Sequence, residues 1–213
     1  LYARFWHKVL FDLGYLSTPE PFHQLVNQGL ILGEDGQKMS KSRGNVVNPD
    51  DVVEQYGADS LRLYEMFMGP LEQVKPWSMK GVEGVFRFLA RVWRLVMDND
   101  QEGNWVISEK ITEAEPDKKV NKALHATIKK VGEDIEGMAF NTAISQMMVC
   151  SNELTKLEKV PASSVITLLQ LLNPFAPHLT EELNARLAKA FGSLSSDGLA
   201  DREWPQFIEE YLH

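Results

Sequence analysis

The chain has 213 residues, a formal net charge of −8 at neutral pH and one cysteine, Cys150. This length fits one or two domains with a sizeable core. A single cysteine excludes an internal disulfide framework, and no Cys/His cluster has the spacing of a zinc site. The acidic balance argues against indiscriminate binding of nucleic acid, although a locally basic surface could still bind it.

The sequence also gives no sign of membrane insertion or export. Its longest apolar runs are far shorter than a bilayer span. The N-terminal stretch is amphipathic and aromatic, unlike a signal peptide. We therefore expect a cytoplasmic protein that has no membrane partner.

The N-terminal segment predicts a helix and then a short strand. Apolar residues recur at helical spacing through residues 1–16, and Gly14 is a suitable stop. Pro19 and Pro21 mark a loop. Residues 28–32 are apolar and bounded by turn residues, so they predict a buried strand. The apolar positions of the helix are Tyr2, Phe5, Trp6, Val9, Leu10 and Leu13.

A glycine-rich cationic loop comes next, and its centre reads Lys38, Met39, Ser40, Lys41 and Ser42. Two ammonium groups beside hydroxyl and backbone N–H donors suit a phosphate whose charge grows during a reaction. The pattern of a Walker phosphate loop is absent. Because residues 33–45 have little apolar bulk, we expect them to be mobile without a ligand. Two lysines at this spacing also occur on ordinary solvated loops, so the spacing alone leaves that alternative open.

Two short helices should follow the loop. Asn48 can cap the first helix, Pro49 suits its first position, and Gly57 ends it. The second helix begins at residue 59 or 60 and runs to residue 69. On this helix we expect Arg62 to pair with a neighbouring acid, with contact to a nucleic acid as the alternative.

The chain is helical beyond a turn-rich connector at residues 71–80, and we place a domain boundary after residue 78. Several antiparallel helices with short links predict a bundle, in which Cys150 is inert core. We expect helices at about 82–97, 120–138, 141–157, 165–172 and from 177 onward, with a mobile polar loop over 98–115. The inward positions of the first of these helices are Val82, Val85, Phe86, Leu89, Val92, Trp93 and Val96.

Two sets of basic side chains each fall on one helical face. Either set could contact the phosphates of a nucleic acid, and the alternative for both is a solvated helix face. The sets are Arg87, Arg91 and Arg94, and Lys118, Lys122 and Lys129.

Residues 29–47, which contain the sequence KMSKS, closely resemble the signature of class I aminoacyl-tRNA synthetases. Residues 1–8, 25–29 and 64–73 resemble bacterial-type leucyl-tRNA synthetases, and residues 171–183 resemble the helical anticodon-binding domain of these enzymes. Asn184 stands where many members have tryptophan. The resemblance covers essentially the whole chain. It implies a mainly α fold: the end of a catalytic domain, with a short strand, the KMSKS loop and helices, over 1–78, then an antiparallel anticodon-binding-type bundle over 79–213.

The resemblance also implies an activity: ATP-dependent activation of leucine and its transfer to tRNA(Leu). ATP, leucine and tRNA(Leu) would be the ligands of a monomeric enzyme, with Mg²⁺ held mainly by ATP and no metal ligand from this chain. Lys41 matches the family's principal phosphate-binding lysine and Lys38 its partner, so these two are the expected catalytic residues. Gly44 and Asn45 should let the loop hinge. The other expected ATP contacts are Met39, Ser40, Ser42 and the backbone of Gly29, Leu30 and Ile31, which would lie beside adenine.

Parts of the family pattern are missing from the sequence. There is no HIGH signature, since the five histidines are isolated, and there is no room for an editing domain. We therefore expect a segment of a longer enzyme that cannot form the adenylate by itself; a natural truncated paralogue is the alternative. Specificity for leucine rests on the resemblance alone. A non-catalytic tRNA- or protein-binding module and a scaffolding bundle remain open as other functions.

Overall fold

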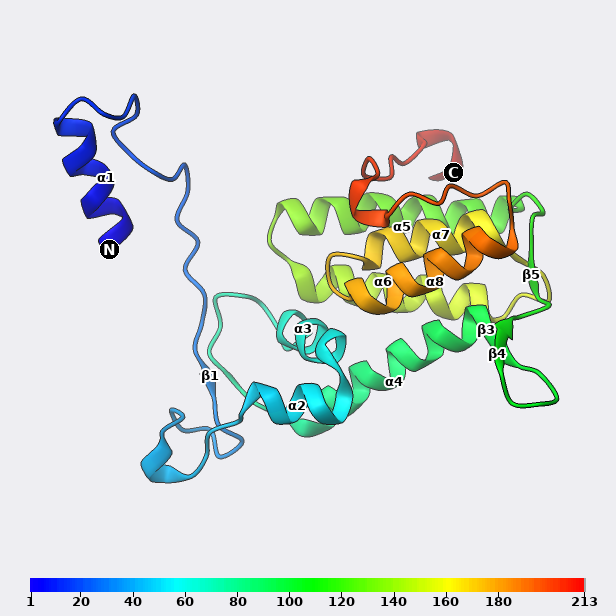
Figure 1. Cartoon of the computed structure of the whole chain (residues 1–213), viewed down its shortest axis with the longest axis horizontal. Coiled ribbons are helices and arrows are strands. Elements are labelled where there is room, and N and C mark those ends of the chain that lie inside the picture. The colour runs from blue at the N-terminus through cyan, green and yellow to red at the C-terminus, as the bar shows by residue number, and fades with distance from the viewer. Residues whose placement is uncertain (213) are drawn as a thin grey trace.

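The computed structural model describes residues 1–212 and is mainly α-helical, as the sequence predicted. The N-terminal helix α1 (Tyr2–Asp12) is followed by an extended segment, a loop and then a helical body (Figure 1). The predicted stop is confirmed, because Gly14 lies just beyond the helix with a φ of 79°. None of the residues of α1 is buried, and Figure 1 shows this helix set apart from the body.

A minimal parallel pairing joins the extended segment to the connector. Strand β1 (Ile31–Leu32) pairs with β2 (Lys75–Pro76). The predicted strand is therefore present, but it spans two residues and is half-buried instead of buried. The closest backbone approach is at Gly29, whose N–H donates to the Leu71 carbonyl over 2.7 Å.

Replacing Gly29 with alanine should open this pairing. A Cβ at position 29 would stand 2.0 Å from the Gln73 carbonyl oxygen, so the two backbones would have to separate. We expect a loss of roughly 3 kcal/mol in local stability, seen as faster amide exchange at Lys75, whose N–H donates to the Leu30 carbonyl over 3.1 Å. Gly84→Ala is the control, because no atom lies within 4 Å of its Cβ position. Equal exchange in both variants would contradict this account.

Two helices follow the loop, α2 (Pro49–Tyr56) and α3 (Ala58–Phe67). The Asn48 side chain accepts a hydrogen bond from the Asp50 N–H over 3.2 Å, so the predicted cap is confirmed. Gly57 separates the helices with a φ of 87°, as its position predicted. The pair packs against the first part of the bundle (Figure 1).

The predicted bundle is present. Leu124, Ile144 and Leu183 are buried in its core. In Figure 1 the later helices of the bundle lie side by side, with α4 running beneath them toward α2 and α3. The helices are α4 (Met79–Val96), α5 (Lys118–Glu136), α6 (Phe140–Thr155), α7 (Ala162–Leu172) and α8 (Pro177–Ala190), followed by the short turns η2 (Leu199–Asp201) and η3 (Glu209–Leu212).

The inward face predicted for α4 is partly wrong. Phe86 is 43% exposed and Trp93 is only half-buried, whereas Phe88 and Leu95 are buried. Phe86 instead lies edge-on against Tyr56 of α2, with ring centroids 5.6 Å apart. The helix packs against α3, α6 and α8. Its buried face is therefore wider than the face predicted from the spacing of apolar residues, and it is turned about the helix axis relative to that face.

The expected mobile loop at residues 98–115 is also wrong, because this segment contains strands. β3 (Met97–Asn99) and β4 (Trp105–Ile107) form an antiparallel hairpin, and β5 (Ile111–Thr112) pairs with β6 (Val160–Pro161). Asp100 closes the hairpin turn by accepting the Asn104 N–H over 2.8 Å. The polar composition correctly predicted a turn, but it gave no signal for the short strands on either side of that turn.

Cys150 lies inside the bundle and is 2% exposed, which confirms that it is core. Burial raises the pKa of its thiol to about 11. The thiol therefore stays protonated near neutral pH and is a poor nucleophile.

Candidate nucleotide-binding loop

The signature loop, residues 33–45, begins with a tight turn. The Gly33 N–H donates to the Gln37 carbonyl over 2.9 Å, and Gly36 adopts a φ of 72° that glycine tolerates without strain. Directly after this turn, Lys38 forms an antiparallel bridge back to Leu32. The turn thus brings the lysine-bearing part of the loop beside β1.

Asn45 and Asp35 form the centre of the loop's hydrogen bonds. The Asn45 amide donates to Asp35 Oδ1 over 3.0 Å and accepts the Ser40 N–H over 2.9 Å. These contacts, Asn45 first and then the Gln37 N–H, hold the pKa of Asp35 below its usual range. From the sequence, Asn45 was predicted only as part of a hinge. The signal it missed was Asp35 before Gly36, a pair typical of turns in which the aspartate side chain bonds the backbone.

The second half of the signature forms a short turn. A single turn, η1 (Lys41–Arg43), is capped by Ser40, whose hydroxyl oxygen is 3.2 Å from that of Ser42. Lys38 and Lys41 are both exposed. No carboxylate within residues 1–212 forms an ion pair with either lysine. Two ammonium groups and two hydroxyls are therefore available to an anionic ligand.

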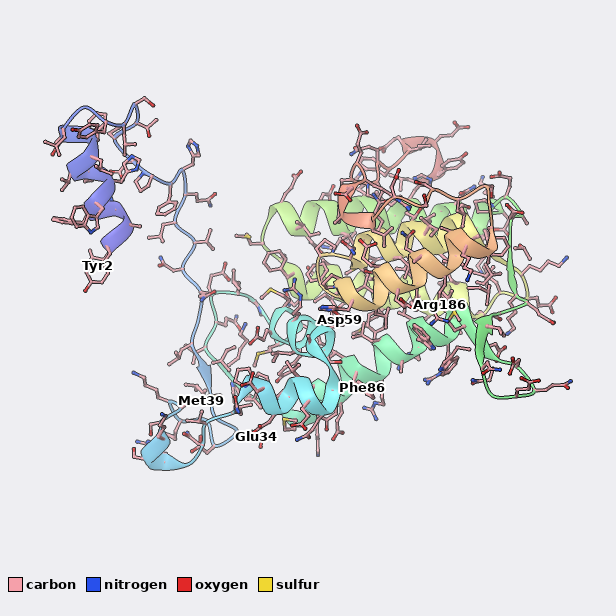
Figure 2. All side chains as sticks on the ribbon, in the orientation of Figure 1. Tyr2, Glu34, Met39, Asp59, Phe86 and Arg186 are labelled. Atoms are coloured by element: carbon pink, nitrogen blue, oxygen red, sulfur yellow. The ribbon has the colours of Figure 1, made fainter. Side chains whose placement is uncertain are left out.

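Two other side chains attach the loop to the body, and Figure 2 labels both. Met39 is half-buried and packs against the hydrophobic core. Glu34 accepts the N–H of Met79, the first residue of α4, over 3.0 Å. Because the Met39 side chain is an anchor, any contact that this position makes with a nucleotide would come from its backbone.

The three residues expected to lie beside adenine precede the loop. Leu30 is 49% exposed, Ile31 is half-buried, and Gly29 packs against the connector backbone. The bridge between Leu32 and Lys38 places this stretch beside the loop, so the two groups of predicted ligand residues are neighbours. Their contact with adenine stays a prediction.

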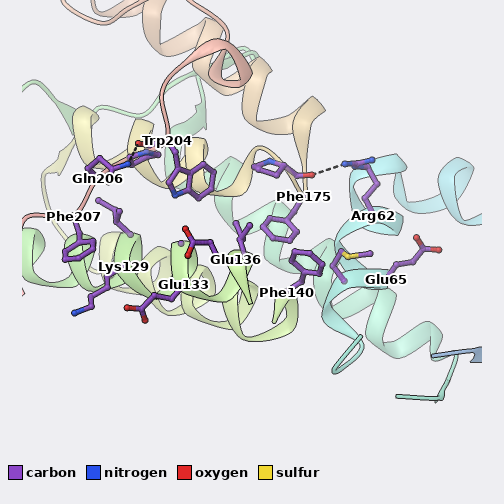
Figure 3. Close-up of a pocket in the computed structure, with 16 residues that line it drawn as sticks. Arg62, Glu65, Lys129, Glu133, Glu136, Phe140, Phe175, Trp204, Gln206 and Phe207 are labelled. Atoms are coloured by element: carbon purple, nitrogen blue, oxygen red, sulfur yellow. Dashed lines mark hydrogen bonds between the residues drawn. The ribbon is translucent and has the colours of Figure 1, made fainter. Parts of the chain in front are cut away.

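A separate cavity of about 750 Å³ lies between α3, α5 and the C-terminal segment (Figure 3). Phe140, Phe175 and Trp204 give it aromatic walls. No residue of the signature loop lines it, so it is separate from the candidate nucleotide site. At its edge Arg62 donates to the Pro174 carbonyl over 2.8 Å, so the predicted pairing of Arg62 with an acid is wrong (Figure 3).

Residues 1–212 contain no group of three or more His, Cys, Asp or Glu side chains that could hold a metal ion. In the same range no helix combines the length and apolar content that crossing a membrane requires.

The loop should be mobile when no nucleotide is bound. Most of the hydrogen bonds that residues 33–45 make have both partners inside the loop, so few bonds hold the loop to the body. Gly44 adopts a φ of 66° at the end of η1. We expect weak amide protection across residues 38–42 of the ligand-free full-length protein, measured by hydrogen exchange, and stronger protection when ATP is added. Strong protection of the ligand-free loop would reject the hinge.

Comparison with known proteins identifies both parts of the chain. Residues 2–75 match the family model of class I tRNA synthetases for isoleucine, leucine, methionine and valine. Residues 117–212 match the model of the anticodon-binding domain of tRNA ligases. The chain is 56% identical over 212 residues to a leucine–tRNA ligase of Leptospira biflexa and 61% identical over 183 residues to one of Pelodictyon phaeoclathratiforme. These alignments cover 100% and 86% of this chain, but 23% and 22% of those relatives.

A solved structure agrees with these matches. It is the agnB2 LeuRS of Agrobacterium radiobacter K84 in a ternary complex with tRNA and LeuAMS, at a TM-score of 0.79 and 33% identity. The match covers all of this chain and 28% of that one. The chain thus spans about a quarter of the length of the curated relatives it matches. It belongs to the leucyl-tRNA synthetases, within the class I aminoacyl-tRNA synthetase family.

Proposed function

We propose that the longer protein represented by this segment is a leucine–tRNA ligase, which activates leucine with ATP and transfers it to tRNA(Leu). The observation that carries the proposal is the pair of exposed ammonium groups, Lys38 and Lys41, on a loop within the matched class I region. Neither ammonium is neutralised by a carboxylate within residues 1–212, so both can act on phosphate.

The loop would act during activation. The leucine carboxylate attacks the α-phosphate and pyrophosphate leaves, so charge builds on the phosphate oxygens. We assign Lys41 to stabilise this charge, with Lys38 as its partner. Ser40 and Ser42 supply hydroxyl and backbone N–H donors. ATP supplies the adenylyl group and brings Mg²⁺ on its phosphates.

The adenine site, the two domains and the oligomeric state are assigned by resemblance to the same family. The backbone at residues 29–31 would receive adenine, beside the loop. Residues 1–78 would form the end of the catalytic domain and residues 79–213 the tRNA-binding bundle. The longer protein would be a cytoplasmic monomer.

The exposed arginines of α4 are the first candidates for tRNA contact. Arg87 and Arg91 are both exposed, although Arg91 also lies 6.0 Å from the centre of the Phe88 ring. In the other basic set, Lys129 is half-buried and lies 5.1 Å from the centre of the Phe207 ring. Reversing both charges, with Arg87→Glu and Arg91→Glu, should weaken tRNA binding about tenfold and flatten its salt dependence. The matched control reverses two exposed lysines outside both basic sets, with Lys119→Glu and Lys159→Glu. Unchanged binding in the arginine double variant would mark this stripe as a solvated helix face.

The function is tested by aminoacylation with the full-length protein. It should charge tRNA(Leu) with leucine and discriminate against isoleucine and valine, measured with purified tRNA and labelled amino acids. Binding of tRNA without any charging would instead indicate a non-catalytic binding module.

A further inference from the structure

Asp59 lies at the start of α3 but caps a different helix. Its carboxylate is 8% exposed and reaches the first turn of α8, 120 residues later in the chain. Oδ2 accepts the Leu179 N–H over 2.7 Å, and Oδ1 accepts the His178 N–H over 3.3 Å and lies 2.9 Å from His178 Nδ1. A carboxylate at this position also complements the positive end of the α8 dipole.

Arg62 adds a second contact from the same helix. Its guanidinium donates over 2.8 Å to the carbonyl of Pro174, which lies in the corner just before α8. The two side chains are three residues apart on α3, so they project from one side of that helix. Asp59 thus accepts from backbone N–H groups at the start of α8, and Arg62 donates to the backbone carbonyl just before that helix. Both are charge-assisted hydrogen bonds.

α3 is bonded in turn to the base of the signature loop. The Tyr64 hydroxyl accepts the Ser78 N–H over 2.8 Å, and the next residue, Met79, donates to Glu34 of the loop over 3.0 Å. Gly81 lets the Tyr64 ring lie against α4, because a Cβ there would stand 2.5 Å from the ring. A continuous set of contacts therefore runs from the first turn of α8, through α3, to the loop.

We propose that Asp59 is a positioning residue that couples tRNA held by the bundle to the loop-bearing catalytic part. This inference rests on the proposed function and names a residue outside the signature. Without the carboxylate, the bundle can shift relative to α3, and the tRNA end is misaligned with the aminoacyl group. Adenylate formation needs only ATP and leucine, so it should not depend on this contact.

The test uses Asp59→Ala in the full-length enzyme, with Asp117→Ala as the matched control. Asp117 also caps a bundle helix, accepting the Val120 N–H over 2.8 Å, but it makes this bond within the bundle. Each variant is assayed for leucine-dependent pyrophosphate exchange without tRNA and for kcat/KM in tRNA charging. For Asp59→Ala we expect charging about tenfold lower with exchange near normal, a factor ordinary for coupling between sites. Asp117→Ala should be near normal in both assays.

Three results would overturn the proposal: normal charging by Asp59→Ala, an equal loss in Asp117→Ala, or an exchange rate that falls as far as charging. Asp59→Asn keeps the shape and one accepting oxygen, so it should show a smaller loss confined to charging. If Asp59→Ala does not fold, Asp59→Asn tests the proposal instead, through the same comparison of tRNA charging with pyrophosphate exchange. Failure of the proposed function is a different outcome, because the unmodified enzyme would then show neither activity.

Discussion

Replacing Lys41 with alanine in the full-length enzyme should slow leucyl-adenylate formation roughly a hundredfold. The reason is the loss of one charge-assisted contact in a closed site, at a cost of about 3 kcal/mol in the transition state. Lys38→Ala should cost less if that lysine contacts ATP mainly in the ground state. Leucine-dependent pyrophosphate exchange measures both effects.

Four further variants control for charge and shape. Arg43→Ala removes another exposed cation of the same turn and should leave the rate nearly normal. Lys41→Arg should not rescue fully, because a planar guanidinium cannot replace a compact ammonium at the same place. Ser40→Ala and Ser42→Ala should be mild, since backbone donors remain. If Arg43→Ala were as slow as Lys41→Ala, the slower rate would reflect the total positive charge of the loop and not a specific contact of Lys41.

A polypeptide of these 213 residues alone should make no leucyl-adenylate. It lacks the HIGH signature, and the relatives that it matches are about four times longer. The rest of the ATP cradle and the leucine pocket are therefore expected elsewhere in the full-length protein. The assay is pyrophosphate exchange with the purified chain.

This result requires a folded sample. Far-ultraviolet circular dichroism should show the helical content of the bundle, and the full-length enzyme at equal concentration provides the positive control. Exchange by the folded chain clearly above a buffer blank would refute the expectation.

Much of the fold could be predicted because its signals are local. The cap at Asn48, the stop at Gly57 and the inward positions Val85 and Val92 depend on residues within one or two turns. The hairpin at residues 97–107 was missed because its strands have three residues each, too few for alternation to be visible.

The residues of the candidate site were predicted from a family resemblance and not from local structural signals. The signature residues were found by resemblance, and the structure adds what holds them: the bonds of Asn45 and Asp35 and the anchoring Met39 side chain. Asp59 shows the limit. An acid in the first turn of a helix looks like a local feature, and nothing near it in sequence reveals that it caps a helix 120 residues away.

Rapid-quench measurement of adenylate formation, in a single turnover across a range of ATP concentrations, tests the central claim most directly. It separates the affinity for ATP from the rate of the chemical step at saturating ATP. If the loop stabilises the transition state, Lys41→Ala will lose roughly a hundredfold in the saturated rate, with much less change in ATP affinity. A near-normal saturated rate, or a loss confined to ATP affinity, would contradict the assignment of this loop as the phosphate clamp.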